Sequence, residues 1–279
     1  MGAHVFVGGG LTAAGLPYAE RIGAEALQVF VSNPRGWAAS PGDAHVDASF
    51  AATCADRKLP VFVHAPYLVN FGSPTEATRD KSAAAVAHSL ARGRRICADG
   101  VVVHAGSAVD RGARDVALKV MAEALLPILD GLGDDDPMVL IEPTAGGGEP
   151  LAATVEDLGP LFDALEFHPR LGVCLDTCHA FAAGHDLSAP GGVRATLKSL
   201  VKTVGAGRLK LIHANDSKDP LGSGRDRHTN IGAGCIGTES FAELFRHPAT
   251  RGVPVVVETP GDVAAHRRDL ETLRSLRDR

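Results

Sequence analysis

The chain has 279 residues, a length typical of one barrel-sized domain, and 45% of them are hydrophobic, enough for a sizeable core. The formal net charge of −5 argues against a generally basic nucleic-acid coat, although it allows a local basic groove. No apolar run approaches the length of a membrane span, and no basic-then-apolar signal segment opens the chain. We therefore expect a soluble, cytoplasmic protein.

Short β-branched runs recur along the whole chain, and each is followed by turn residues and then by a helical pattern. Because these runs are apolar without polar alternation, they predict strands buried on both faces, as in parallel sheets. The predicted strands are His4–Gly8, Leu27–Val31, Pro60–His64, Gly100–His104, Val139–Glu142, Leu171–Asp176, Leu209–His213 and Val253–Glu258.

Helical periodicity fills several of the segments between these strands. The predicted helices cover Glu76–Ala98, Arg114–Leu132, Val155–Leu165, Gly192–Thr203 and Asp262–Leu276. Strand–helix alternation repeated eight times favours a closed barrel over an open sheet. No linker or shift in composition divides the chain. The sequence thus predicts an α/β fold, a single (β/α)₈ TIM barrel domain over residues 1–279.

Chemistry-bearing side chains fall at the ends of six predicted strands. They are His64, His104, Glu142, Asp176, His213 and Glu258, and just beyond strand ends lie His179, Asp226 and His228. The C-terminal ends of barrel strands meet at one rim, where catalytic residues converge. So many carboxylates and imidazoles in one pocket need cations to offset their desolvation and repulsion.

Five imidazoles with four carboxylates suit zinc better than magnesium or calcium, and manganese or iron are acceptable substitutes. Nine ligands with one bridging carboxylate predict about three ions, an arrangement suited to phosphoester hydrolysis. The other histidines are interpreted as structural or solvated: His4, His45, His88, His168, His185, His247 and His266. The five cysteines, an odd number without framework spacing, are expected to be reduced and mostly buried.

The sequence resembles the endonuclease IV family of apurinic/apyrimidinic endonucleases from end to end. The most specific blocks are C-L-D-T-C-H-A-F-A-A-G (Cys174–Gly184), H-A-N-D-S-K (His213–Lys218), D-R-H-x-N-I-G-x-G (Asp226–Gly234) and V-E-T-P (Val257–Pro260). The resemblance implies a barrel with three zinc ions. By similarity, His64 and His104 bind the first ion and Glu142 bridges to the second. Asp176, His213 and Glu258 complete the second site, and His179, Asp226 and His228 hold the third.

The resemblance also implies a partner, double-stranded DNA with an abasic site, which such enzymes kink while the lesion is flipped out. The matching DNA-contact positions are Arg35, the wedge residues Tyr67 and Leu68, and Asn70. Lys218, Arg225 and Arg227 are expected to contact phosphates. Four positions depart from the common family pattern without removing a ligand: Ala105, Pro143, Gly147 and His185.

The expected reaction is hydrolysis of the phosphodiester 5′ to the abasic site, which leaves a 3′-hydroxyl and a 5′-deoxyribose phosphate. In this hypothesis Glu142 fixes the spacing of two ions and Glu258 orients or deprotonates the attacking water. Two alternatives remain: a sugar isomerase or epimerase of the same barrel superfamily, with fewer metals and a carboxylate-heavier shell, and a non-enzymatic binder of damaged DNA. A monomer is the default, since no spare hydrophobic stripe stands out.

Overall fold

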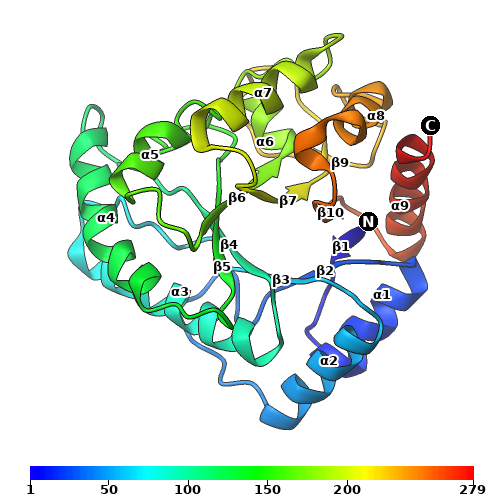
Figure 1. Cartoon of the computed structure of the whole chain (residues 1–279), viewed down its shortest axis with the longest axis horizontal. Helices are drawn as coiled ribbons and strands as arrows, with labels where there is room; N and C mark the ends of the chain where they lie inside the picture. The colour runs from blue at the N-terminus through cyan, green and yellow to red at the C-terminus, as the bar shows by residue number, and fades with distance from the viewer.

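The computed structural model describes residues 1–279 and shows a closed barrel of parallel strands with helices around it (Figure 1). Around the barrel the strand order is β1-β10-β7-β6-β5-β4-β3-β2, so β1 closes the ring by pairing with both β2 and β10. The strands are β1 (Gly2–His4), β2 (Leu27–Val29), β3 (Val61–His64), β4 (Gly100–His104), β5 (Met138–Glu142), β6 (Leu171–Asp176), β7 (Leu209–His213) and β10 (Val255–Val257). The predicted barrel is confirmed.

Outside the barrel, the helices form a ring against its outer face (Figure 1). They are α1 (Leu16–Ile22), α2 (Ala44–Asp56), α3 (Glu76–Arg95), α4 (Arg114–Asp130), α5 (Leu158–Ala164), α6 (Thr177–Ala182), α7 (Gly192–Val204), α8 (Thr238–Arg246) and α9 (Val263–Arg277), with short turns η1 (Leu11–Gly15) and η2 (Pro248–Thr250). An antiparallel pair, β8 (Asp216–Ser217) and β9 (His228–Thr229), follows β7. None of the helices combines the length and apolar character that crossing a bilayer demands.

The first strand lies earlier in the chain than the sequence predicted. The apolar run from Val5 to Val7 suggested a strand over His4–Gly8, but β1 ends at His4. Backbone pairing with β2 stops at the bond from Val5 N–H to the carbonyl of Gln28 (2.8 Å). Phe6 then turns outward and is 77% exposed. Because the neighbouring strands end at this level, the chain beyond Val5 has no ladder to join.

Two separate apolar clusters build the core. The larger one fills the space between the barrel and the helices. The smaller one consists of Ala26, Phe62, Val102, Leu140, Cys174, Leu211 and Val256. Each member lies on a different barrel strand or directly before it, and we call this set the interior plug. Since it fills the barrel interior with side chains, no pore runs along the axis.

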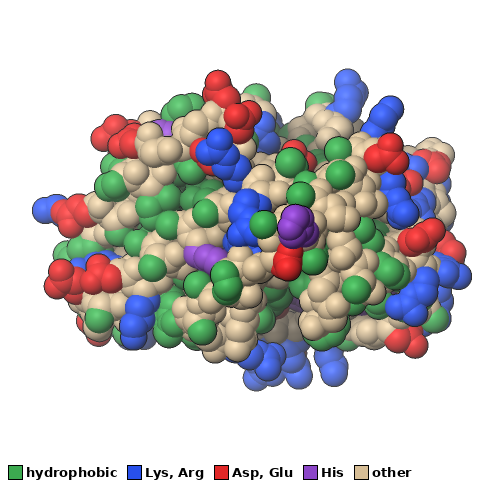
Figure 2. Space-filling view, turned by 90° about the horizontal axis from the view of Figure 1, so that it is seen from below, with side chains coloured by type: hydrophobic (Ala, Val, Ile, Leu, Met, Phe, Trp, Pro, Cys, Tyr) green, Lys and Arg blue, Asp and Glu red, His purple; other side chains and the backbone are tan.

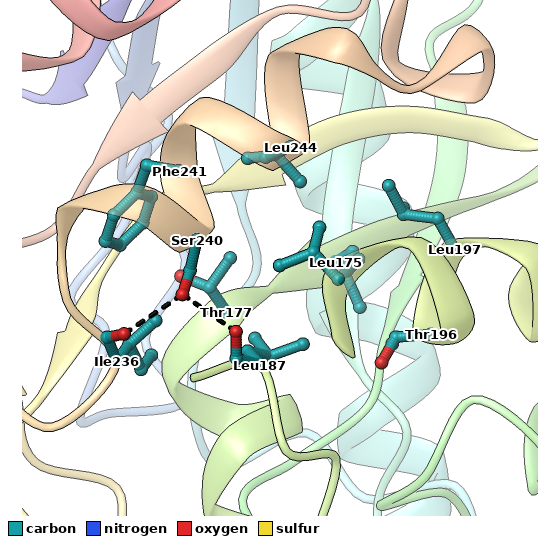
Figure 3. A pocket seen from close by; sticks show the side chains of 10 residues that line it. Leu175, Thr177, Leu187, Thr196, Leu197, Ile236, Ser240, Phe241 and Leu244 are labelled. Atoms are coloured by element: carbon teal, nitrogen blue, oxygen red, sulfur yellow. Dashed lines mark hydrogen bonds between the residues drawn. The ribbon is translucent and has the colours of Figure 1, made fainter. Parts of the chain in front are cut away.

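A small void remains between β6, α7 and α8 (Figure 3). Its volume is about 10 Å³, and apolar side chains such as Leu175, Leu197 and Phe241 line most of it. The Ser240 hydroxyl reaches the carbonyl oxygens of Leu187 (2.7 Å) and Ile236 (3.0 Å). The void has room for about one water molecule. It is a packing gap and too small for a substrate.

The surface carries charges of both signs. On the side of the barrel shown in Figure 2, Lys and Arg side chains are interspersed with Asp and Glu, with apolar groups between them. All five cysteines are free thiols, three of them buried and Cys97 and Cys235 exposed.

Candidate metal centre

The interior plug positions a polar layer directly above it. Side chains two residues apart on a strand point to the same face. Each plug residue is followed two positions later by a polar residue, and these are Gln28, His64, His104, Glu142, Asp176, His213 and Glu258. The polar layer therefore faces the barrel axis at the C-terminal rim and lies directly above the interior plug. The six ligand candidates at strand ends come together as the sequence predicted.

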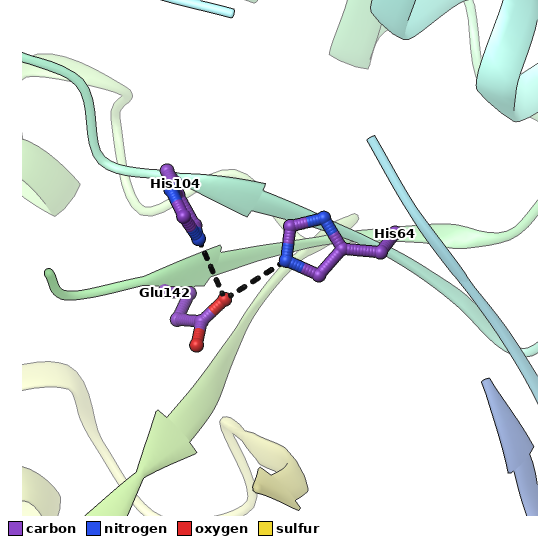
Figure 4. A group of neighbouring side chains, drawn as sticks. All are labelled: His64, His104 and Glu142. Atoms are coloured by element: carbon purple, nitrogen blue, oxygen red, sulfur yellow. Dashed lines mark ion pairs between the residues drawn. The ribbon is translucent and has the colours of Figure 1, made fainter. Parts of the chain in front are cut away.

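The first group joins three neighbouring strands, β3, β4 and β5 (Figure 4). Both His64 Nε2 and His104 Nε2 face Glu142 Oε2, at 3.3 Å and 3.4 Å. Glu142 is completely buried. Figure 4 shows the two rings converging on one carboxylate oxygen, and the three ligand atoms lie within 4.8 Å of one another.

The second group uses the other oxygen of the same carboxylate. His213 Nδ1 lies 3.0 Å from Glu142 Oε1 and 3.2 Å from Glu258 Oε2. Asp176 Oδ2 completes the group at 3.8 Å from His213 Nδ1. Asp176 is also the N-cap of α6, where its Oδ1 accepts the backbone N–H of His179 (2.9 Å). The cap fixes this carboxylate because Asp side chains satisfy free helix N–H groups, and it turns Oδ2 towards the rim.

The third group is carried by α6 and by the loop that leads into β9. Asp226 Oδ1 lies 3.2 Å from His179 Nε2 and 2.9 Å from His228 Nε2. His228 Nε2 also lies 3.5 Å from Asp176 Oδ2, which links this group to the second. The loop is closed at its base by the pairing of β8 with β9 and by the bond from Lys218 N–H to the carbonyl of Arg227 (2.9 Å). The buried Asp216 anchors the loop that follows β9 by accepting the backbone N–H groups of Gly232, Gly234 and Ile236.

Three of the rim histidines are oriented as metal ligands usually are, with one ring nitrogen bonded to the protein. His64 Nδ1 contacts the carbonyl of Ala65 (2.7 Å), and His179 Nδ1 that of Pro143 (3.1 Å). His213 Nε2 donates to the amide oxygen of Gln28 (2.8 Å). In each case the opposite nitrogen faces the carboxylates.

Several buried ligand atoms have no hydrogen-bond partner. These are Glu142 Oε2, His179 Nε2 and His228 Nε2. An unpaired buried polar atom costs about 1–3 kcal/mol, so three of them in one cluster call for a ligand. The mixed nitrogen and oxygen donors fit zinc or a similar divalent cation. The residues present therefore suit a metal cluster.

Protonation of the histidines would be the other way to balance the buried carboxylates. Burial opposes a charge on His228, but Asp176 and Asp226 raise its pKa to about 9. Burial likewise opposes a charge on His179, yet Asp176, Asp226 and Glu142 raise its pKa well above the usual value. Burial disfavours the ionised form of Glu142, but His213, His104 and His179 hold its pKa well below the ordinary range. Protons and cations therefore compete for the same positions.

Two thiols lie close enough to join the groups, Cys174 beside His213 and Cys178 beside Asp176. Burial raises the pKa of each thiol to about 12. Only the thiolate is a good metal ligand. Both thiols are therefore protonated in the metal-free protein.

Two rim residues were missed by the sequence reasoning. His4, interpreted as structural or solvated, ends β1, and its Nδ1 lies 3.2 Å from Glu258 Oε1. The misplaced first strand hid it, because a strand beginning at His4 puts this residue at the opposite end of the barrel. Gln28 lies on β2 and bonds Glu258 Oε1 (2.7 Å). The sequence signal that could have revealed Gln28 is a glutamine inside an otherwise apolar strand.

The residues expected to contact DNA lie on loops at this rim. Arg35 is exposed, and Tyr67 and Leu68 are 48% and 38% exposed. The Tyr67 ring lies 5.4 Å from that of His64 and 5.7 Å from that of His104. Burial beside the carboxylates raises the pKa of Tyr67 to about 12, so its hydroxyl stays neutral. Asn70 Oδ1 accepts the N–H groups of Gly72 (3.1 Å) and Ser107 (2.9 Å), so this oxygen is used within the protein.

The basic residues of the loop after β8 differ in their environments. Arg227 forms a two-pronged ion pair with the carboxylate of Asp219. Arg225 Nη1 lies 3.7 Å from the same carboxylate. Lys218 is exposed and forms no ion pair within 4.0 Å. Lys218 is thus the freest cation of the three.

Comparison with known proteins fits this geometry. A family model described as xylose isomerase-like TIM barrel matches residues 16–277. A protein of Streptomyces avermitilis named "Probable endonuclease 4" is 58% identical over 279 residues, 100% of this chain and 90% of the relative. The chain belongs to the endonuclease 4 family. The crystal structure of endonuclease IV from Thermus thermophilus superposes with a TM-score of 0.84 at 32% identity, covering 99% of this chain and 97% of that one.

Epimerases share only the fold with this endonuclease 4 family member. A D-tagatose 3-epimerase-like protein superposes with a TM-score of 0.70 at 18% identity, covering 91% of this chain and 89% of that one. Two of the four departures from the family pattern form hydrogen bonds near the rim. Pro143 supplies the carbonyl that orients His179, and His185 Nε2 accepts the N–H of Val155 (3.1 Å).

Proposed function

We propose that the chain is an apurinic/apyrimidinic endonuclease that hydrolyses the phosphodiester 5′ to an abasic site in duplex DNA. The products are a 3′-hydroxyl and a 5′-deoxyribose phosphate. One observation carries the proposal: three ligand groups share one rim in a chain of the endonuclease 4 family, the first two joined through the two oxygens of Glu142 and the third linked to the second through Asp176. A sugar isomerase or epimerase is not favoured, because the relative at 58% identity is an endonuclease 4 and the epimerase-like structure at 18% identity shares only the fold.

We assign three divalent cations, zinc in at least one site, to these groups. His64, His104 and Glu142 would hold the first ion, and Glu142 would also serve the second. Asp176, His213 and Glu258 would complete the second site, and His179, Asp226 and His228 would hold the third. Bound cations of this kind activate water and neutralise charge on phosphate oxygens. Manganese or iron can replace zinc in nitrogen and oxygen sites of this type.

The protein's own contribution to the reaction comes from two carboxylates. Glu142 is fully buried and presents one oxygen to each of two groups, which fixes their separation. Glu258 is partly open to the rim, and its Oε1 is occupied by Gln28. Its Oε2 faces the second group, where it would hold the cation and orient or deprotonate the attacking water beside it.

The rim loops supply the DNA contacts in this proposal. Tyr67 and Leu68 stand exposed beside the first group, where an aromatic and an aliphatic side chain can replace lost base stacking. Arg35, Asn70, Lys218, Arg225 and Arg227 then contact the backbone on either side. Since Asp219 pairs with Arg227, we expect Lys218 to contribute more than Arg227 to the salt dependence of binding.

The deciding experiment is an end-group assay on a duplex with one abasic site. A hydrolase leaves a 3′ end that primes a polymerase directly. A lyase cuts on the 3′ side through a Schiff base with lysine, and borohydride traps its protein–DNA adduct. None of the nine assigned rim ligands is a lysine, so we expect primer extension and no adduct. Trapping of an adduct, or a product that cannot prime, would overturn the assignment.

Three further assignments stay predictions: a monomer, one domain over residues 1–279 and a cytoplasmic location. Gel filtration of the fraction that cuts abasic DNA measures the first of them.

A further inference from the structure

Gln28 is the polar residue of an otherwise apolar barrel strand. It lies on β2, between Leu27 and Val29, and all three residues have no exposed surface. The side chain stands in the polar layer above the interior plug residue Ala26. An amide is buried at this depth only when its donors and acceptor are satisfied.

The nitrogen and the oxygen of the Gln28 amide both form hydrogen bonds with rim residues. Its Nε2 donates to Glu258 Oε1 (2.7 Å) and to His4 Nδ1 (2.9 Å). Its Oε1 accepts the Nε2–H of His213 (2.8 Å). Glu258 and His213 both belong to the second ligand group, and both are held from the side opposite to their ligand atoms.

No other side chain of this length offers the same set of bonds. The site needs one acceptor for His213 and two donors for Glu258 and His4. A glutamate would bring a second negative charge beside Glu258 Oε1. A methionine would leave the buried Nε2–H of His213 without a partner. The residue type is therefore dictated by the two ligands that it joins.

We propose that Gln28 is a positioning residue that fixes Glu258 and His213 relative to each other and so tightens the second cation site alone. His4 is the outer support: its ring lies 4.4 Å from that of Phe30 and its Nδ1 contacts both Gln28 and Glu258. No side-chain hydrogen bond joins Gln28 to the first group. The inference rests on the proposed metal cluster, but it concerns ion affinity and not the reaction on DNA.

The test measures zinc release from the loaded protein. A chromogenic chelator is added to wild type and to Gln28→Met, which preserves length but not hydrogen bonding. Partners that orient metal ligands typically contribute about 10- to 100-fold in affinity, so we expect one zinc per chain to leave at least about tenfold faster. The remaining ions should leave at the wild-type rate. The exposed Asp110→Asn on the loop after β4 serves as the control.

A role in folding alone predicts a different result. If Gln28 merely fills space, Gln28→Met either leaves every ion unchanged or loosens all of them together with a lower melting temperature. Either result overturns the inference. Should Gln28→Met fail to fold, His4→Phe keeps a ring beside Phe30 while removing the contact with Gln28, and it must loosen the same single ion by a smaller factor. Equal release of all ions from His4→Phe also overturns it.

The outcome is separable from that of the proposed function. Wild-type protein that holds its ions but does not cut abasic DNA refutes the reaction and leaves the role of Gln28 testable by release. Wild-type protein that cuts, while Gln28→Met releases zinc as wild type does, refutes the role of Gln28 only.

Discussion

The three ligand groups differ in what carries them. The first and second groups lie on strand ends, which we call the strand-borne ligands, and Glu142, Asp176 and His213 there have no exposed side-chain surface. The third group, the loop-borne ligands, lies on α6 and the loop before β9, and the side chain of Asp226 is 53% exposed. All three groups nevertheless share contacts through Glu142 and Asp176.

The strand-borne and loop-borne ligands therefore differ in rigidity and in exposure to solvent. Strand-borne ligands are held by the sheet ladder and by the interior plug below them, so their spacing is rigid. Loop-borne ligands are held by the N-cap of α6 and by the pairing of β8 with β9, and the Asp226 side chain is open to solvent. A substrate phosphate approaching from solvent meets the loop-borne side first. We expect the two classes to respond differently to substitution.

The largest effect is expected from Glu142→Gln. The amide cannot bridge two cations, so both strand-borne sites should lose affinity together. Loss of several kcal/mol of charge stabilisation corresponds to a fall in cleavage of about a thousandfold or more. Elemental analysis should show at least two ions missing per chain. Full zinc content with wild-type cleavage would contradict the bridging role, and the melting temperature confirms that the variant folds.

Glu258→Gln should have the next largest effect on cleavage and should leave the affinity for DNA nearly unchanged. The amide retains size but cannot accept a proton, so cleavage should fall by about 10²- to 10⁴-fold. Affinity for an abasic duplex, measured by fluorescence anisotropy, should change little. If binding falls as far as the rate does, Glu258 acts in recognition rather than in the reaction.

Asp226→Asn tests the contrast between the two classes directly. We expect loss of one ion per chain, because the loop-borne group alone depends on Asp226, and a fall in cleavage of about a hundredfold. The strand-borne ions should stay. The matched control is Asp110→Asn, an exposed carboxylate on another rim loop. Loss of all the ions from Asp226→Asn would show that the classes are not separable.

The strand-borne ligands could be predicted from the sequence, whereas the other features of the rim could be predicted only in part. Strand ends are visible as apolar runs that stop at His, Asp or Glu, and parallel strands bring these ends to one rim. His4 and Gln28 were missed because their contacts depend on β1, β2 and β10 being neighbours, which requires the barrel to close. The pairing of Arg227 with Asp219 was missed since a loop's internal ion pairs leave no periodic signal.

Replacing both Tyr67 and Leu68 by Ala should weaken cleavage of abasic duplex at subsaturating substrate by about tenfold, given that stacking on one side chain contributes about 1–3 kcal/mol. Zinc content should not change, because neither residue is a ligand. The exposed Val116→Ala on α4 is the control for loss of surface apolar area. A double variant with the wild-type rate would show that these side chains only pack the loop.

The smallest effect concerns the stability of zinc-free protein against pH. The pKa of His228 is raised to about 9 by Asp176 and Asp226, against burial. Its contribution to folding stability is therefore complete below about pH 6.5 and is lost as the pH rises through about 9. Asp226 has a lowered pKa, since His179 and His228 outweigh its burial, so its contribution is complete above about pH 4 and is lost progressively as the pH falls from there towards the lowered pKa.

Zinc-free protein should consequently be most stable between about pH 4 and 6.5 and should lose on the order of 1–2 kcal/mol towards pH 9, a figure discounted because Asp226 is half exposed. Loaded protein should show the opposite trend in zinc affinity, because cations displace the protons from the histidines. Urea unfolding of the zinc-free and the loaded protein between about pH 4 and about pH 9 measures how the free energy of unfolding of each form depends on pH. In His228→Gln the alkaline loss should shrink in the zinc-free form. A zinc-free protein that gains stability from pH 6.5 to 9 would show that protons do not occupy the cation positions.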